Sequence, residues 1–160
     1  MSVTPKIIVG WRELVSLPDW HISSIRAKID TGANTSAIDV NKVEALPNGQ
    51  VRFDVVKNNK HRHRTHWITA DVVRHTVVRS SNGTREVRYV VSTNLRLGDL
   101  VREVEFTLVR RSNMLCRMLI GRTALTPNYV VDVSKRYITR KPKKRKTKAV
   151  SKILKLKKKK

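Results

Sequence analysis

The chain is poor in cysteine and in long apolar runs, and each shortage excludes a class of protein. Its one cysteine, Cys116, cannot form a disulfide within the chain, so a reducing compartment is expected. No apolar run approaches the length that crosses a bilayer, so we expect no membrane span. Residues 1–20 also lack the apolar stretch of a signal peptide. Together these shortages favour a cytoplasmic protein.

Acidic residues are scarce as well, and the imbalance is uneven along the chain. The 160 residues include 35 Lys or Arg and 12 Asp or Glu, which gives a formal net charge of +23. Thirteen of the basic residues and no acid lie in residues 140–160. Like charges at this density keep a segment solvated and extended. We therefore predict one globular domain over residues 1–139 and a disordered Lys/Arg-rich tail over residues 140–160.

Short runs rich in β-branched residues, separated by turn signals, predict an all-β domain. Asn82-Gly83 is a strong hairpin signal, and it predicts a hairpin across residues 76–93. Helical periodicity is weak, and the best helical candidate is a turn or two after Gly121 that ends near Pro127. The β runs lie at residues 6–11, 25–29, 51–56, 67–73, 76–79, 86–93, 104–109, 118–120 and 129–133.

One short motif carries the clearest chemical signal. Asp30-Thr31-Gly32-Ala33 follows a β run, and an aspartic protease holds its catalytic carboxylate in such a loop at the end of a strand. Glycine lets the backbone approach the acid closely. This assigns catalysis to Asp30 and support of the loop to Thr31, Gly32 and Ala33. The motif alone also fits an ordinary turn.

A second element, Met118-Leu119-Ile120-Gly121, strengthens the catalytic interpretation. Pepsin-like half-barrels pass an apolar-apolar-Gly strand beside the Asp-Thr-Gly loop and then enter a helix. The order here is Asp-Thr-Gly loop, hairpin, apolar-apolar-Gly strand and helix. This is the order of a retropepsin monomer, so the expected fold is a retropepsin-like (acid protease) barrel with a flap-like hairpin and a short C-terminal helix. Gly121 joins the residues that support the loop.

Three blocks of sequence resemble a bacterial retropepsin-like family often labelled "ATP-dependent zinc protease", the RimB-like group. The sequence departs from the pattern of that group at Asn34, where Arg is more usual, and at Asp39, where His is common. The resemblance implies an aspartic peptidase linked with trimming of oligoglutamate tails on a ribosomal protein. The blocks are residues 9–13 with 17–18, residues 27–37, and residues 79–125.

The resemblance also implies a substrate-binding flap over an acidic peptide. Arginine side chains suit such a substrate because a guanidinium can donate two parallel hydrogen bonds to one carboxylate. For any one arginine, a solvated strand residue is an equally good interpretation. The flap residues assigned to substrate binding are Arg79, Ser80, Ser81, Gly83 and Arg88.

The residues do not support the ATP and zinc of that label. The sequence has neither a G-x-x-x-x-G-K-[ST] phosphate loop nor a His-Glu-x-x-His zinc motif. His61, His63 and His66 are interleaved with Arg62 and Arg64, whose charges repel a cation. We therefore expect no metal and no cofactor.

The expected mechanism requires two chains. One chain offers a single Asp-Thr-Gly, whereas the reaction needs two carboxylates that share a proton around one water, so we predict a homodimer. Ala33 lacks the hydroxyl that pepsins place next to the acid, and activity is therefore expected to extend toward neutral pH.

A binding function is the alternative. The protease-like fold would then be catalytically idle and serve as a basic RNA- or ribosome-binding module, because Lys/Arg runs bind phosphate backbones without sequence preference. The tail lacks interleaved aromatic residues for base stacking. In a eukaryotic source, residues 143–146 would also fit a nuclear-localisation signal. The intact Asp30-Thr31-Gly32 favours catalysis, and the tail is compatible with both functions.

Overall fold

Strands dominate the computed structural model, which describes residues 4–57, 65–79, 82–110, 112–113 and 115–142. Two 3-10 turns, η1 (Pro18–Trp20) and η2 (Pro47–Gly49), and one helix, α1 (Arg122–Leu125), accompany them. The strands are β1 (Ile7–Gly10), β2 (Arg12–Leu17), β3 (Ile22–Ile29), β4 (Ser36–Ala45), β5 (Gln50–Val56), β6 (Thr65–Arg79), β7 (Arg85–Leu97), β8 (Leu100–Val109), β9 (Met118–Ile120) and β10 (Tyr129–Asp132).

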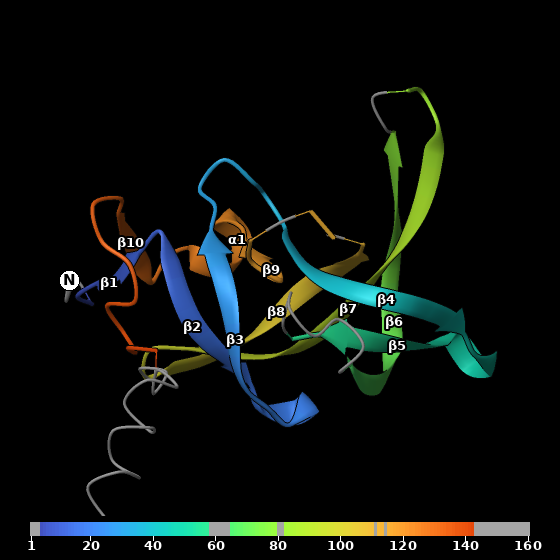
Figure 1. Cartoon of the computed structure of the whole chain (residues 1–160), viewed down its shortest axis with the longest axis horizontal. Coiled ribbons are helices and arrows are strands. Elements are labelled where there is room, and N and C mark those ends of the chain that lie inside the picture. The colour runs from blue at the N-terminus through green and yellow to red at the C-terminus, as the bar shows by residue number, and fades with distance from the viewer. Residues whose placement is uncertain (1–3, 58–64, 80–81, 111, 114, 143–160) are drawn as a thin grey trace, which may run out of the picture.

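The main sheet closes on itself. Its strands follow the order β2-β3-β9-β4-β5-β6-β7-β8, and the additional pairings β2–β7 and β4–β8 complete a barrel through β2, β3, β9, β4, β8 and β7. β5 and β6 form a second path between β4 and β7. Figure 1 shows the far end of the β6–β7 hairpin projecting away from the barrel. β1 and β10 form a separate parallel pair near the barrel's edge.

Alternation along the strands fills the barrel with apolar side chains. Trp20, which is buried in η1, makes an edge-to-face contact with Phe53 at a centroid distance of 5.3 Å and packs against Phe106 at 6.5 Å. Burying a side chain of this size contributes about 1.5–3 kcal/mol. The core thus fixes the barrel against which the loops at strand ends are held.

A buried carboxylate ties the end of the domain to β2. Glu13 is fully buried, and its Oε1 accepts hydrogen bonds from the N–H groups of Gly10 (2.7 Å) and Ile138 (3.0 Å). Its Oε2 accepts from the N–H (3.3 Å) and hydroxyl (2.9 Å) of Thr139. A Cβ on Gly10 would lie 2.5 Å from the carbonyl oxygen of Lys135, so only glycine fits there. The Gly-Trp-Arg-Glu segment is therefore an anchor for residues 135–139.

The structure confirms the predicted all-β, retropepsin-like fold. The hairpin and the short helix lie where the sequence placed them. The β runs at residues 67–73 and 76–79 form one strand, β6, and two further strands, β2 and β4, were not predicted. Residues 143–160 of the predicted tail lie outside the described residues. No helix in the described part of the chain is long and apolar enough to cross a membrane.

Candidate active site

Asp30 stands at the end of β3, in a loop that the backbone holds tightly. Its N–H donates to the carbonyl of Ile120 at 2.9 Å, which continues the pairing of β3 with β9. The N–H of Gly32 donates to Asp30 Oδ1 at 3.1 Å, and the N–H of Ala33 donates to the Asp30 carbonyl at 3.2 Å. The carboxylate is 25% exposed. One of its oxygens is thus fixed by the loop while the side chain still reaches solvent.

The other carboxylate oxygen faces a lysine. Lys28 Nζ lies 3.4 Å from Asp30 Oδ2, and the Lys28 side chain is 46% exposed. Both residues therefore lie on the outer face of β3, which alternates with the buried Ala27 and Ile29. Sequence reasoning did not assign Lys28 to the site, although its position two residues before the acid predicts a shared face.

The segment Gly121–Thr123, after β9, clamps the loop from behind. A Cβ on Gly121 would lie 2.5 Å from the carbonyl oxygen of Thr35, so the predicted supporting role of Gly121 has a steric basis. The N–H of Gly121 donates to Ser36 Oγ at 3.0 Å. The N–H of Arg122 donates to the Ala33 carbonyl at 2.9 Å. β9 and α1 therefore hold the loop although they lie about ninety residues away in the sequence.

Two side chains complete this clamp. Arg122 Nη1 donates to the carbonyl of Thr31 at 3.0 Å, and Thr123 Oγ1 donates to the carbonyl of Asn34 at 3.0 Å. Thr31 itself is exposed, so its carbonyl rather than its side chain is what the clamp holds. The roles of Arg122 and Thr123 depend on contacts between distant segments, and no local sequence signal indicated them.

One continuous face of the sheet leads from Asp30 toward the hairpin. Residues that pair directly across neighbouring strands point to the same face. The chain of partners starts at Lys28, next to Asp30, and ends on the hairpin strands β7 and β6. It runs through Lys28, Leu119, Ala37, Thr107, Val90 and Arg74. We call this side of the sheet the catalytic face, after the candidate catalytic residue at its edge; Leu119, Thr107 and Val90 on it are buried.

The hairpin presents the two predicted arginines differently. Arg88 pairs with Thr76 and alternates in phase with Val90, so it belongs to the catalytic face. Its guanidinium donates to Glu86 Oε2 at 2.8 and 3.1 Å. Arg79 pairs with Arg85 in the opposite phase, so it lies with Val77 and Val87 on the side of the hairpin away from the catalytic face. The two arginines do not lie together.

The tip of the hairpin contains the remaining flap predictions. Gly83 has a φ of +83°, which the hairpin turn requires and glycine provides. Ser80 and Ser81, which the sequence assigned to substrate binding, lie outside the described residues.

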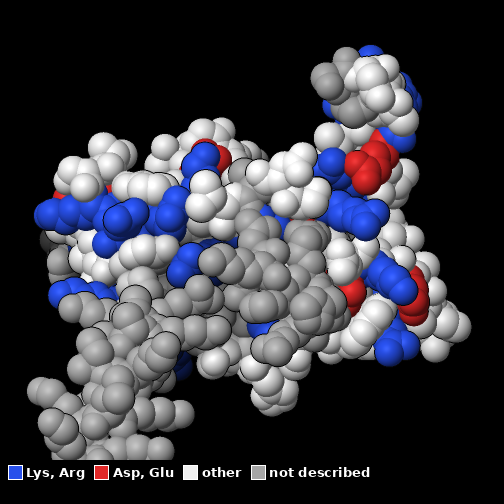
Figure 2. Space-filling view, in the orientation of Figure 1, with Lys and Arg blue, Asp and Glu red and all other residues white. Residues whose placement is uncertain are grey.

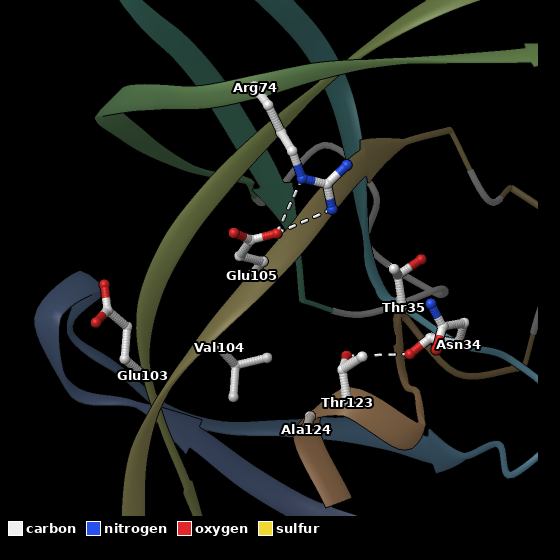
Figure 3. Close-up of a pocket in the computed structure, with 8 residues that line it drawn as sticks. All are labelled: Asn34, Thr35, Arg74, Glu103, Val104, Glu105, Thr123 and Ala124. Atoms are coloured by element: carbon white, nitrogen blue, oxygen red, sulfur yellow. Dashed lines mark hydrogen bonds and ion pairs between the residues drawn. The ribbon is translucent and has the colours of Figure 1, made fainter.

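A pocket of about 380 Å³ lies at the edge of the catalytic face. Asn34 and Thr35, which follow the Asp30 loop, form one wall with Thr123 and Ala124 of α1 (Figure 3). Arg74 spans the other side and donates to Glu105 Oε2 at 2.9 and 3.1 Å. Glu103 and Val104 complete the lining. The pocket has a mixed polar and apolar lining and adjoins the candidate catalytic loop.

Comparisons with known proteins place this geometry in a family. Residues 8–142 match the RimB-like family, described as retropepsin-like aspartic endopeptidase RimB. The chain belongs to this family. A solved structure of a Legionella pneumophila protein of unknown function superimposes with a TM-score of 0.70 at 25% identity, covering 85% of this chain and 100% of that one.

Curated relatives of the RimB-like chain are longer proteins with a different name. A probable alpha-L-glutamate ligase of Shewanella pealeana is 33% identical over 135 residues, which are 82% of this chain and 30% of the relative. One of Parasynechococcus marenigrum is 34% identical over 133 residues, 81% of this chain and 28% of the relative. The chain thus spans less than a third of the curated relatives it matches.

The departure from the RimB-like pattern at Asp39 has a structural counterpart. Asp39 is fully buried on β4 and forms an ion pair with Arg117 Nη1, and Arg117 is 2% exposed. Breaking a buried pair of this kind by removing one partner costs about 3–5 kcal/mol. The other departure, Asn34, lines the pocket and accepts Thr123's hydroxyl through its backbone carbonyl. Asp39 therefore acts in packing, and Asn34 borders the site.

The histidine cluster does not form a described metal site. His66 Nε2 lies 2.8 Å from the carbonyl oxygen of Trp20, while His61 and His63 lie outside the described residues. Among the residues that the structure describes, no group of three His, Cys, Asp or Glu side chains is arranged to hold a metal ion.

Proposed function

We propose that this RimB-like chain is a homodimeric aspartic peptidase in which Asp30 and its symmetry mate hydrolyse peptide bonds. The observation that carries the proposal is the partly exposed Asp30 carboxylate, fixed by the Gly32 N–H in a loop clamped by Gly121. The sequence contains one Asp-Thr-Gly and no Asp-Ser-Gly, and in this proposal a second copy supplies the other carboxylate. A two-fold axis beside the loop brings two identical acids together.

The ribbon of β1 and β10 supports this assembly. Ile8 and Val130 pair directly across the ribbon, and they are 57% and 48% exposed. Both strands pair only with each other among the described strands, so each has an open edge. Exposed strand edges with apolar side chains favour pairing with another chain. The ribbon is therefore the proposed contact with the second copy.

The proposed reaction uses one shared proton. Two carboxylates at close range do not both ionise, so one Asp30 holds a proton and its mate is charged. The charged acid takes a proton from a water between them while the water oxygen adds to the substrate carbonyl carbon. The protonated acid gives its proton to the carbonyl oxygen. Collapse of the tetrahedral intermediate then breaks the C–N bond, and the leaving amine takes up a proton.

The proposed substrate is an acidic, glutamyl-rich peptide or protein tail in the cytoplasm. The long relatives are named as probable glutamate ligases, and the region they share with this chain is less than a third of their length. A peptidase segment joined to a ligase that adds glutamate would act on the ligase's product. The chain's positive charge attracts such a product.

The test is turnover of a quenched fluorogenic oligoglutamate peptide by the full chain. Asp30→Asn should lower kcat by at least about a thousandfold, since loss of an essential catalytic group has effects of this order. Asp99→Asn makes the same chemical change at an exposed turn and should leave kcat unchanged. EDTA should also leave turnover intact. Wild-type turnover in Asp30→Asn would contradict the proposed mechanism. Loss of turnover in EDTA that is reversed by added zinc would indicate metal catalysis instead.

A further inference from the structure

A row of basic side chains runs along the outer face of the β2–β3 hairpin and ends at Asp30. Arg12 pairs directly with Lys28, and Arg26 follows Lys28 two positions back along β3, on the same face. Arg26 and Lys28 are exposed, and Arg12 is half-buried. Figure 2 shows Lys and Arg side chains gathered on the side of the molecule where β2 and β3 lie. We call Arg12, Lys28 and Arg26 the basic row.

The basic row is electrostatically unfavourable on its own. Like charges directly opposite each other on neighbouring strands repel. In the described part of the chain, neither Arg12 nor Arg26 forms an ion pair, and the one ion pair of Lys28 is with the candidate catalytic residue Asp30. The Arg12 guanidinium lies 4.4 Å from the Trp11 ring centroid, which holds it in place, and its Nε is buried without a hydrogen-bond partner. Such an arrangement is explained by an anionic ligand.

The position of the row indicates which part of a ligand would meet it. Lys28 shares a face with Asp30, and its strand partner Leu119 belongs to the catalytic face. A peptide bond held over Asp30 therefore places a flanking side chain near Lys28 and Arg12. Alternate residues of a strand lie about 7 Å apart, in the row and in an extended peptide alike. Arg26 is thus in register with the next alternate side chain of such a peptide.

We infer that Lys28 and Arg12 form the subsite that recognises an acidic side chain next to the scissile bond, with Arg26 extending it. The inference rests on the proposed peptidase function. In the free protein the Lys28 ammonium contacts Asp30 Oδ2. A substrate carboxylate takes over this ammonium and also accepts from Arg12, which releases Asp30 Oδ2 toward the water. Lys28 and Arg12 are specificity residues in this scheme, and Asp30 remains the catalytic residue.

A peptide fits the row better than an RNA backbone does. The row ends at a carboxylate, Asp30, which repels a phosphate chain but is the group that a scissile peptide bond must reach. The Trp11 ring beside the row has the Arg12 guanidinium over one face, so that face is not available to stack on a base.

The experiment compares an oligoglutamate peptide with the matched oligoglutamine peptide, using the full chain throughout. The quantity measured is the ratio of their kcat/KM values, because this ratio separates recognition from a general loss of catalysis. Lys28→Gln and Arg12→Gln should each lower the ratio by about tenfold or more, the effect of losing one charge-assisted hydrogen bond. Lys28→Arg should retain most of the ratio. Lys42→Gln, which removes an exposed lysine near the far end of β4, should leave it unchanged.

A second measurement reads recognition without cleavage. Binding of the oligoglutamate peptide to Asp30→Asn should weaken by about tenfold or more when Lys28→Gln is added. An unchanged kcat/KM ratio together with unchanged binding overturns the subsite. Binding of a mixed-sequence RNA oligomer should also be measured with and without Lys28→Gln. If this substitution weakens RNA binding as much as peptide binding, the row is a general polyanion surface and the subsite is overturned. If the protein shows no Asp30-dependent cleavage but peptide binding still depends on Lys28, the proposed peptidase function is wrong and the proposed subsite stands.

Discussion

The buried Glu13 allows the stability of the domain to be tested apart from its chemistry. Its carboxylate accepts four hydrogen bonds, three from backbone N–H groups and one from the Thr139 hydroxyl. In Glu13→Gln, one oxygen becomes an NH₂ group. If it replaces Oε2, the Thr139 hydroxyl rotates to accept from it, but the Thr139 N–H loses its acceptor. The minimum damage is therefore one unsatisfied buried donor and three weakened contacts.

The magnitude follows from these contacts. A buried donor without a partner costs about 1–3 kcal/mol, and hydrogen bonds to a charged acceptor exceed neutral ones by about 1 kcal/mol. Relief from burying a charge offsets part of this loss. We expect Glu13→Gln to lower the free energy of unfolding by about 2 kcal/mol and the Tm by roughly 6–8 °C. Glu13→Ala removes all four acceptor contacts and should cost about 4 kcal/mol or more.

Urea and thermal unfolding, followed by circular dichroism at one fixed protein concentration, measure both quantities. The fixed concentration is needed because dimerisation makes Tm depend on it. Glu44→Gln, at an exposed position of β4, is the matched control and should stay within about 0.5 kcal/mol of wild type. If the Tm and free energy of unfolding of Glu13→Gln match those of Glu44→Gln, the buried carboxylate does not anchor residues 138–139, and the reasoning is refuted.

Three further predictions concern the dimer, the tail and a buried phenol. Specific activity should fall when the protein is diluted below its dimer dissociation constant, and Ile8→Glu should raise the concentration required; constant activity in a preparation that sediments as a monomer would contradict the dimer. Removal of residues 143–160 should leave peptide turnover largely intact, and it should sharply weaken RNA binding and reduce its dependence on salt in filter assays. Burial raises the pKa of Tyr129 above 10.0, so a pH titration followed by phenolate absorbance should show one tyrosine that ionises at higher pH than the others. This transition should be absent in Tyr129→Phe. The stability that this protonated phenol contributes is present below about pH 10 and falls as the pH rises above it.

The sequence predicted those strands whose hydrophobic pattern follows local rules. β9 was located at its observed bounds because an apolar triplet ends at a glycine. β2 was missed because its buried face contains Glu13 while Leu14 lies on the half-exposed face, which inverts the usual alternation. β4 was missed because Ser36 and Asp39 are buried and its register shifts between Val40 and Val43. In each case a buried polar group has partners that come from distant segments.

The candidate site divides in the same way. A local motif identified Asp30 and its loop, but the clamp formed by Arg122 and Thr123 depends on the pairing of β9 with β3 and β4. The hairpin was predicted as a unit, but strand phase decides which of its arginines lies on the catalytic face. That phase places Arg88 on the catalytic face and Arg79 on the other. The charged residues in the sequence thus indicate the class of ligand, whereas the strand register decides which of these residues lie on the face where the ligand would bind.

Lys28 connects the proposed recognition of acid to the proposed proton sharing. In the proposed dimer each Asp30 brings its own Lys28, so two ammonium groups accompany the paired carboxylates. An ammonium in contact with a carboxylate favours its ionised form, whereas a nearby like charge favours the protonated form. An acidic side chain that draws Lys28 away from Asp30 would therefore leave the two acids of the proposed dimer facing each other, and this favours the singly protonated pair that the proposed hydrolysis requires. A neutral side chain leaves Lys28 in place. On this argument, the same lysine that binds the acidic substrate also prepares the dyad for it, and discrimination against neutral peptides should appear in kcat as well as in KM.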